Sequence, residues 1–217
     1  MIDFRGVSKS YRAAGGRKLI LGDLSLTLPA GARVALMGRN GAGKSTLLGL
    51  IAGTVPADGG RIVRQGSMSW PLGFAGSFAN DLTGIQNTRF AARIYGADTD
   101  ALVDYVAAFS ELGPFMRMPV RTYSAGMRAR LAFGLSMGLG FDWYLVDEIT
   151  AVGDAAFRTK SLEVFRERLG SAGLLMVSHS VPMLRSFCTA GLVLEAGTAR
   201  YYDDVEDAVA VHEAAMV

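Results

Sequence analysis

The segment from Gly38 to Ser45, GRNGAGKS, constrains the possible fold more than any other part of the chain. It matches the pattern G-x-x-x-x-G-K-[ST] in full. The apolar run Arg33–Met37 precedes it and is predicted to be a strand, and Lys44–Ala52 follows as a predicted helix that ends at Gly53. A strand, a glycine-rich loop and a helix in this order predict a phosphate-binding loop in an α/β protein.

The residue types in this loop explain how it would bind phosphate. Gly41 and Gly43 let the backbone curl so that successive N–H groups point at phosphate oxygens, and the helix N-terminus adds partial positive charge. Lys44 would reach the β- and γ-phosphates, and Ser45 would bind Mg²⁺. The predicted nucleotide-binding residues are Gly38, Arg39, Asn40, Gly41, Ala42, Gly43, Lys44, Ser45 and Thr46.

Two carboxylates, Asp147 and Glu148, follow the apolar run Trp143–Val146 directly. This pattern predicts a buried strand whose acidic end lies at the carboxyl edge of the sheet, where α/β proteins bind their ligands. Asp147 would face the Mg²⁺ ion beside Ser45, and Glu148 would orient or deprotonate the attacking water. A strand followed by an acidic helix N-terminus is the alternative, and the phosphate loop upstream favours the catalytic interpretation.

The rest of the chain alternates between strand and helix patterns, which favours an α/β fold with a mostly parallel sheet. Glycines Gly96 and Gly113 are predicted to end the two helices of a middle helical region. The predicted strands are Ile2–Tyr11, Leu19–Leu28, Arg61–Trp70 and Leu174–Ser178, and Leu192–Glu195 with Thr198–Tyr202 as a terminal hairpin. The predicted helices of the middle region are Leu82–Tyr95 and Thr99–Leu112, and the last residues are expected to form a further short helix.

The amino-acid composition bears on which partners and which cellular compartment can be expected. The 22 Lys and Arg residues nearly balance the 20 Asp and Glu residues and do not cluster, so we expect no nucleic-acid partner. Cys188 is the only cysteine, which excludes an intrachain disulfide and favours a reducing compartment. The N-terminal residues lack an apolar signal segment, and the longest apolar stretch, Leu131–Val146, is too short to span a membrane and contains Asp142.

Further along, residues 123–127 read YSAGM, and Ser124 is a natural N-cap for a helix that continues over Arg128–Gly138. Taken alone, this segment indicates plain helix capping. With the phosphate loop and WYLVDE, however, the chain resembles the ATP-binding-cassette (ABC) family over essentially its whole length. YSAGM stands where that family has its signature, AVGD (residues 151–154) where it has the D-loop, and His179 where it has the switch histidine. Tyr11 matches the aromatic residue that stacks on adenine.

The resemblance implies a mechanism and an architecture. The expected architecture is a single ATP-binding domain over residues 1–217. It has a RecA-like P-loop core, an N-terminal antiparallel β subdomain and an inserted helical subdomain at roughly 75–135. Two such domains would form a head-to-tail homodimer or pair with a second ABC chain. The signature residues Ser124, Ala125 and Gly126 would then contact ATP in trans, while Lys44, Glu148 and His179 act catalytically in cis.

Within the family, the chain resembles the ATPases of capsular-polysaccharide exporters. The segments that carry this are GRNGAGKSTLL, SMSWPLGF, LTGIQNTRFAARIYG, YSAGMRARLAFGLSM and DWYLVDEITAVGD, where Ile149 replaces the proline usual in other branches. This resemblance implies peripheral attachment at the cytoplasmic face of the inner membrane through a polytopic permease subunit, which would handle most of the polysaccharide. The alternatives are export of O-antigen or teichoic-acid polymer, a soluble ABC ATPase of DNA repair or translation, or a scaffold that does not hydrolyse ATP.

One segment departs from the family pattern. The loop that usually carries a glutamine reads SWPLGFAGSFAND, with no glutamine between Trp70 and Asn80, which puts that contact to Mg²⁺ and the γ-phosphate in doubt. The loop is still expected to face the membrane partner. Its apolar side chains would contact that partner or pack within the small subdomain, and they are Trp70, Pro71, Phe74 and Phe78.

Overall fold

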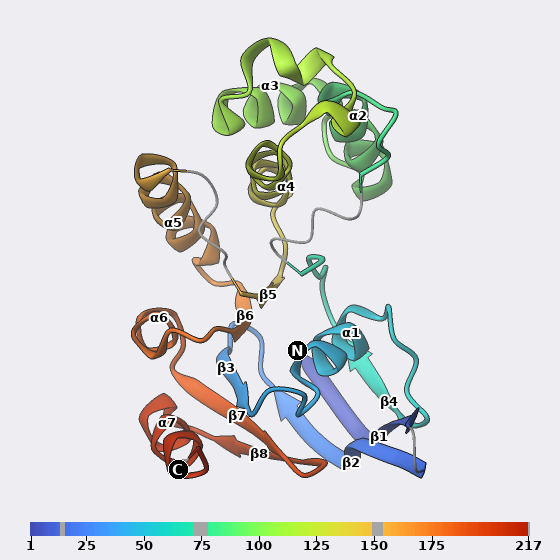
Figure 1. Cartoon of the computed structure of the whole chain (residues 1–217), viewed down its shortest axis with the longest axis vertical. Helices are drawn as coiled ribbons and strands as arrows, with labels where there is room; N and C mark the ends of the chain where they lie inside the picture. Colours follow the sequence, from blue (N-terminus) through green and yellow to red (C-terminus); the bar gives the residue numbers. More distant parts are fainter. Residues whose placement is uncertain (14–15, 72–77, 149–153, 217) are drawn as a thin grey trace. The chain divides into compact units, whose positions relative to one another are not determined.

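The computed structural model describes residues 1–13, 16–71, 78–148 and 154–216 (Figure 1). The chain forms two compact units. The first contains residues 1–71, 142–148 and 171–217, and the second contains residues 72–141 and 149–170. Among the described helices, none is long and apolar enough to cross a membrane.

The first unit begins with an antiparallel sheet of strand order β2-β1-β4. Its strands are β1 (Ile2–Ala13), β2 (Gly16–Leu28) and β4 (Gly59–Arg64). The predicted strand Arg61–Trp70 was wrong at its end, because β4 stops at Arg64 and Met68 makes only an isolated bridge to Trp143. The reason is Gly66, whose φ of +92° turns the chain away from the sheet.

The second sheet of this unit has the order β5-β6-β3-β7-β8. The first four strands are parallel and β8 is antiparallel to β7, which confirms the predicted mostly parallel sheet and terminal hairpin. The strands are β3 (Arg33–Gly38), β5 (Trp143–Asp147), β6 (Gly173–Val177), β7 (Ala190–Glu195) and β8 (Thr198–Tyr202). The helices of the unit are α1 (Lys44–Ala52), α6 (Val181–Phe187) and α7 (Val205–Ala214).

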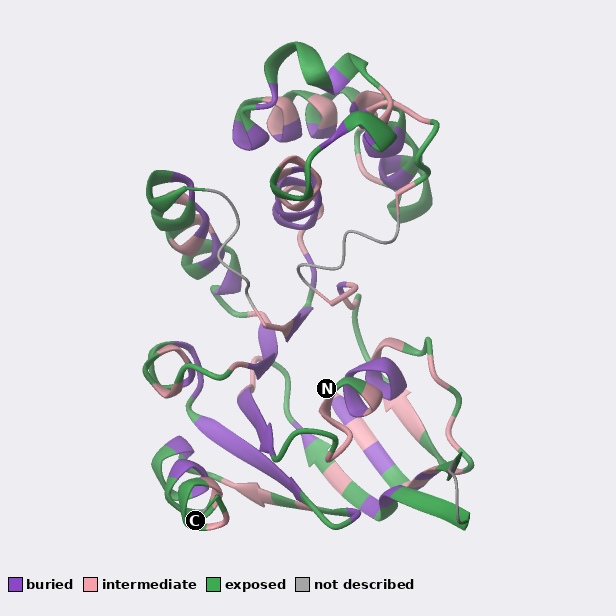
Figure 2. Cartoon of the chain, viewed as in Figure 1, coloured by how far each residue is buried: buried purple, intermediate pink, exposed green. Residues whose placement is uncertain are grey.

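The central strands are buried along most of their length, as expected for a parallel sheet covered on both faces (Figure 2). Trp143, Leu145, Leu175 and Leu36 belong to one hydrophobic core that also includes residues of β1, β2 and α1. The antiparallel sheet and the parallel sheet therefore share a core. This packing fixes the loop after β3 against β2, which matters for the site described below.

The second unit is helical and confirms the helices predicted for the middle of the chain. Its elements are α2 (Gly84–Tyr95), α3 (Thr99–Ser110), the 3-10 turns η2 (Gly113–Arg117) and η3 (Val120–Thr122), α4 (Ala125–Leu139) and α5 (Ala155–Leu169). The predicted end of α3 was wrong by two residues, because Glu111 adopts the left-handed cap conformation at φ +55° and Gly113 starts η2 instead. α2 begins at Gly84 because Thr83 and Gln86 form a capping box.

The single cysteine gives a test of this packing. Cys188 is buried, and burial raises the pKa of its thiol to about 12. At pH 8 we expect the folded chain to react with a disulfide reagent such as DTNB at least about 100-fold more slowly than the urea-unfolded chain, because the thiolate is the nucleophile. Because burial raises the pKa of the Cys188 thiol, the protonated thiol contributes to the free energy of unfolding below pH 9. That contribution should be lost as the pH rises from about 9 toward 12. Rapid labelling of the native chain would contradict the burial, and Cys188→Ser provides the blank.

Candidate nucleotide site

The phosphate loop joins β3, the central strand of the parallel sheet, to α1. Gly38, Gly41 and Gly43 have φ angles of +149°, +76° and +108°, a backbone conformation that other residues rarely adopt. Gly43 is the N-cap of α1 and supplies no side-chain hydrogen bond. A Cβ atom on Gly43 would lie 2.3 Å from Ile20 Cγ2 of β2, so only glycine fits there. The first N–H groups of α1 are therefore available to an anion.

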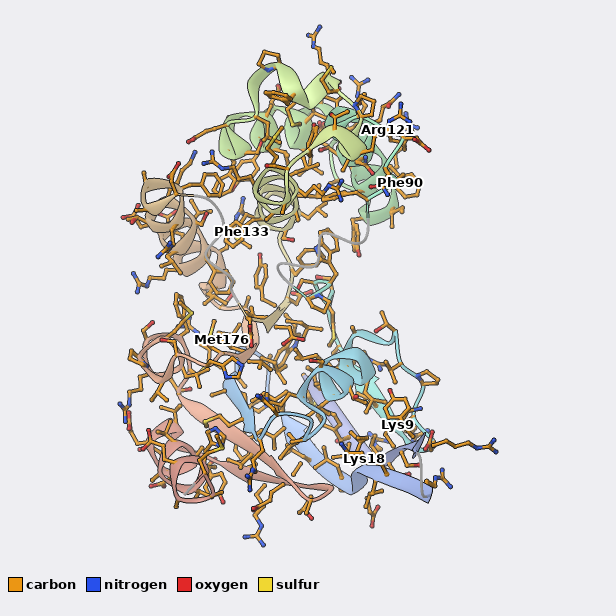
Figure 3. All side chains as sticks on the ribbon, viewed as in Figure 1. Lys9, Lys18, Phe90, Arg121, Phe133 and Met176 are labelled. Atoms are coloured by element: carbon orange, nitrogen blue, oxygen red, sulfur yellow. The ribbon has the colours of Figure 1, made fainter. Side chains whose placement is uncertain are left out.

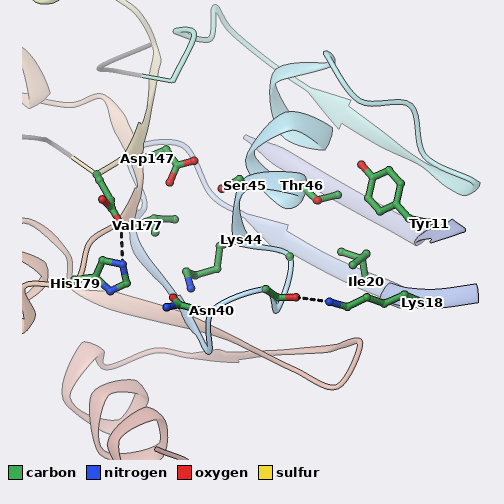
Figure 4. Close-up of a pocket in the computed structure, with 13 residues that line it drawn as sticks. Tyr11, Lys18, Ile20, Asn40, Lys44, Ser45, Thr46, Asp147, Val177 and His179 are labelled. Atoms are coloured by element: carbon green, nitrogen blue, oxygen red, sulfur yellow. Dashed lines mark hydrogen bonds and ion pairs between the residues drawn. The ribbon is translucent and has the colours of Figure 1, made fainter. Parts of the chain in front are cut away.

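A cavity of about 480 Å³ opens at this loop (Figure 4). It lies at the carboxyl ends of the parallel strands β3, β5 and β6, where ligands bind in this class of fold. The lining residues are Tyr11, Lys18, Ile20, Asn40, Gly41, Gly43, Lys44, Ser45, Thr46, Asp147, Glu148, Val177 and His179.

Two lysines hold carbonyl groups of the loop. Lys44 Nζ donates to the carbonyls of Gly38 at 2.6 Å and Arg39 at 3.2 Å. Lys18 Nζ, on β2, donates to the Gly41 carbonyl at 3.0 Å (Figure 4). Burial lowers the pKa of Lys44, and the carboxylates of Asp147 and Glu148 oppose that shift. The loop therefore presents positive charge next to two carboxylates, an arrangement suited to a phosphate–metal complex.

The acidic end of β5 meets the histidine that follows β6. Glu148 Oε1 lies 2.8 Å from His179 Nε2 (Figure 4). Glu148 has a left-handed backbone at φ +54°, and its N–H donates to the Val177 carbonyl at 3.0 Å. A non-glycine residue in this conformation is uncommon and is often found at functional sites. The carboxylate is thus fixed by its backbone and by His179 together.

Tyr11 lies at the end of the cavity opposite His179 (Figure 4) and is 42% exposed. It is the cross-strand partner of Lys18 in the β1–β2 register. The Lys9 ammonium stands over the Tyr11 ring, 5.1 Å from its centroid. An exposed aromatic face beside a phosphate loop can stack on a nucleotide base.

Most of the residues predicted from the sequence come together in this cavity. Arg39 and Ala42 instead line a neighbouring cavity of about 240 Å³, together with residues 194–197. Gly38 contributes its carbonyl to Lys44, and a Cβ atom there would lie 2.5 Å from the Leu194 carbonyl oxygen. Sequence reasoning missed Lys18, Ile20 and Val177, because only the strand pairing brings them to the loop.

The signature residues Ser124, Ala125 and Gly126 belong to the second unit and are exposed. Ser124 is the N-cap of α4, and its Oγ accepts the Met127 N–H at 3.2 Å, as predicted. Asp154 caps α5, accepting the Phe157 N–H at 2.9 Å, and pairs with Arg130 at 3.1 Å. Residues 151–153 of the expected D-loop, Ile149 and Phe74 lie outside the described residues.

The described apolar side chains of the loop after β4 are half-buried. Trp70, Pro71 and Phe78 all have intermediate exposure.

Comparison with known proteins agrees with this geometry. Residues 21–151 match the family model described as ABC transporter. The polysialic acid transport ATP-binding protein KpsT of Escherichia coli is 47% identical over 97% of both chains. The capsule polysaccharide export ATP-binding protein CtrD of Neisseria meningitidis serogroup B is 43% identical over 96% of both chains.

Among solved structures, a dimeric ATP-binding cassette bound to ADP and phosphate superposes with a TM-score of 0.77 at 18% identity, covering 93% of this chain and 97% of that one. This likeness confirms the predicted fold: an α/β P-loop protein with a mostly parallel sheet and an antiparallel β subdomain. The matched family model and the high identity to transport ATP-binding proteins show that the chain belongs to the ABC transporter family.

Proposed function

We propose that this chain is the ATP-hydrolysing subunit of an exporter for capsular polysaccharide. The observation that carries the ATPase assignment is the convergence of the phosphate loop, Asp147 and the Glu148–His179 pair in one cavity. The polymer assignment rests on the relatives named for polysialic acid transport and capsule polysaccharide export. The whole chain would act as one ATP-binding domain, with a helical subdomain at roughly residues 75–135.

The loop residues would bind the phosphates of ATP. In this proposal, the N–H groups of Asn40, Gly41 and Gly43 and of the start of α1 contact phosphate oxygens, and Lys44 turns from its carbonyl partners to the β- and γ-phosphates. Arg39, Ala42 and Thr46 complete the loop. Tyr11 would stack on adenine at the other end of the cavity.

The donor set fits Mg²⁺. Ser45 offers a hydroxyl and Asp147 a carboxylate, both hard oxygen ligands, and both residues line the cavity. Among the described residues no group of three His, Cys, Asp or Glu side chains could hold a metal ion. When bound, the ion would neutralise charge on the β- and γ-phosphates.

Glu148 and His179 would prepare the attacking water. The Glu148 carboxylate would accept a hydrogen bond from the water and receive its proton as the water oxygen bonds to the γ-phosphorus, while the bond from the γ-phosphorus to the β–γ bridging oxygen breaks and ADP leaves with its electron pair. His179 would hold Glu148 in place through the 2.8 Å contact and reach the γ-phosphate with its ring. Ser124, Ala125 and Gly126 of a second copy would supply the remaining phosphate contacts in a homodimer. A polytopic permease would place the pair at the cytoplasmic face of the inner membrane and handle the polymer.

The cargo assignment can be tested in the cell. We would replace the chromosomal copy by the Glu148→Gln variant and measure long-chain polysaccharide at the surface and in the cytoplasm. Export of capsule predicts loss of surface polymer and accumulation inside, because hydrolysis would no longer drive release. Unchanged capsule with normal growth would contradict the cargo assignment and leave the ATPase assignment standing. Glu163→Gln, an exposed carboxylate on α5, is the matched control.

A further inference from the structure

Among the described residues Lys9 is the one buried lysine, and the proposed mechanism does not use it. Its residue exposure is 8%. Burying an ammonium group is costly unless it is paired, and here it has two partners. Nζ donates to the Pro56 carbonyl at 2.8 Å and to Asp58 Oδ1 at 3.0 Å. The two partners come from the turn that precedes β4.

The Asp58 carboxylate accepts hydrogen bonds from three residues: Lys9, Ser10 and Arg17. Its Oδ2 accepts the Ser10 N–H at 2.9 Å, the Ser10 hydroxyl at 2.8 Å and Arg17 Nη2 at 3.1 Å. The hydrogen bond from Lys9, followed by those from Ser10, holds the pKa of the Asp58 carboxyl well below its usual range. Its partners stand on β1 and β2, so Asp58 fixes the Lys9 ammonium relative to both strands.

The same ammonium stands over the ring of Tyr11, 5.1 Å from the centroid. Lys9 and Tyr11 are two residues apart on β1, in a stretch where the β1–β2 pairing shifts register between Lys9 and Ser10. Lys9 belongs to β1, and Lys18, the cross-strand partner of Tyr11, to the neighbouring β2 (Figure 3). A cation at this distance attracts the electron-rich face of the ring.

We propose that Lys9, held by Asp58, is a positioning residue that orients the Tyr11 ring for the nucleotide base and so contributes to selectivity for ATP over ligands without a base. The ring has two faces, and the ammonium lies over one of them. In this proposal the opposite face stacks on adenine at the end of the cavity that Tyr11 lines. This inference rests on the proposed role of Tyr11, and it adds a residue that does not touch the phosphates.

The test compares binding of Mg-ATP with binding of Mg-tripolyphosphate, which has the phosphates but no base or sugar. Lys9→Met keeps the apolar stem in its buried position and removes the charge. We expect the dissociation constant for ATP, measured by calorimetry on the full chain, to rise about three- to tenfold. The constant for tripolyphosphate should stay unchanged, and Lys9→Arg should restore part of the ATP affinity. Arg5→Met, which removes an ion pair of β1 with Asp3 that does not involve Tyr11, is the matched control.

A merely structural role of Lys9 would give a different pattern. If the substitution loosened the sheet, the dissociation constants for ATP and tripolyphosphate would rise by the same factor, and that result would overturn the proposal. Unchanged ATP binding would overturn it as well. A double-mutant cycle tests the coupling directly. In a Tyr11→Leu background, Lys9→Met should cause no further change in the dissociation constant for ATP. If Lys9→Met does not fold, Lys9→Gln with Asp58→Asn replaces the ion pair by a neutral hydrogen-bonding pair, and the same selective loss is expected. Failure of the wild-type chain to bind either ligand would instead contradict the proposed function itself.

Discussion

Replacing Glu148 by glutamine should lower the turnover number for ATP hydrolysis by about two to four orders of magnitude while ATP binding persists. Glutamine keeps the shape of the side chain and can still form a hydrogen bond with His179 at the 2.8 Å position. It cannot accept a proton from the attacking water, and it removes one negative charge near the phosphates. ATP should therefore remain bound and hold two chains together.

The measurement combines steady-state phosphate release with size-exclusion chromatography at saturating Mg-ATP. We expect the Glu148→Gln variant to elute as a dimer with ATP and as a smaller species without it. The control Glu163→Gln should hydrolyse ATP at the wild-type rate, because Glu163 is an exposed residue of α5 in the second unit. Normal turnover in Glu148→Gln would remove Glu148 from its assigned role and point to another base.

Replacing Lys44 by alanine should weaken ATP binding by about 10- to 100-fold, because a hydrogen bond to a charged group contributes roughly 1.5–3 kcal/mol. In the structure the Lys44 ammonium is partly buried and bound to the carbonyls of Gly38 and Arg39, so its side chain is already at the loop. Its pKa is lowered by burial, and a phosphate would supply the counter-charge that favours the protonated form.

Equilibrium binding of Mg-ATP to the Lys44→Ala chain tests this expectation, with the melting temperature measured alongside to exclude unfolding. Lys44→Arg should recover little affinity, since a planar guanidinium does not replace a compact ammonium in a tight loop. Arg93→Ala, an exposed cation of α2, should bind ATP as the wild type does. Unchanged affinity in Lys44→Ala would count against the phosphate-loop assignment.

Local sequence was sufficient for the parts of the site that are local in the chain. The glycines of the loop, the Ser124 cap and the acidic end of β5 were all predicted, because each depends on a few neighbouring residues and their backbone preferences. The same holds for α1, whose start at Lys44 and cap at Gly53 match the prediction. α6 was not predicted, although the Ser180 cap followed by a proline is a recognisable helix start.

The errors fall where a distant contact decides the local structure. β4 ends at Arg64 because Gly66 turns the chain beside Asp142, about 75 positions further along the sequence. α3 ends two residues early because Glu111, not a glycine, takes the left-handed position, and its carboxylate pairs with Lys160 of α5. Neither the end of β4 nor the end of α3 follows from the spacing of apolar residues, because the contacting residues, Asp142 and Lys160, lie in other parts of the chain.

The sequence by itself determined the chemistry of this protein: a phosphate loop, two carboxylates after a buried strand, a histidine after the next one, and an aromatic residue near the start. Tertiary structure decided how these groups are held. Strand pairing brings Lys18 and Ile20 of β2 to the loop, and the turn before β4 brings Asp58 to Lys9, whose ammonium stands over the Tyr11 ring. These contacts join residues that are far apart in the chain. Their strands pair in this register because the two sheets bury their apolar side chains in one shared core.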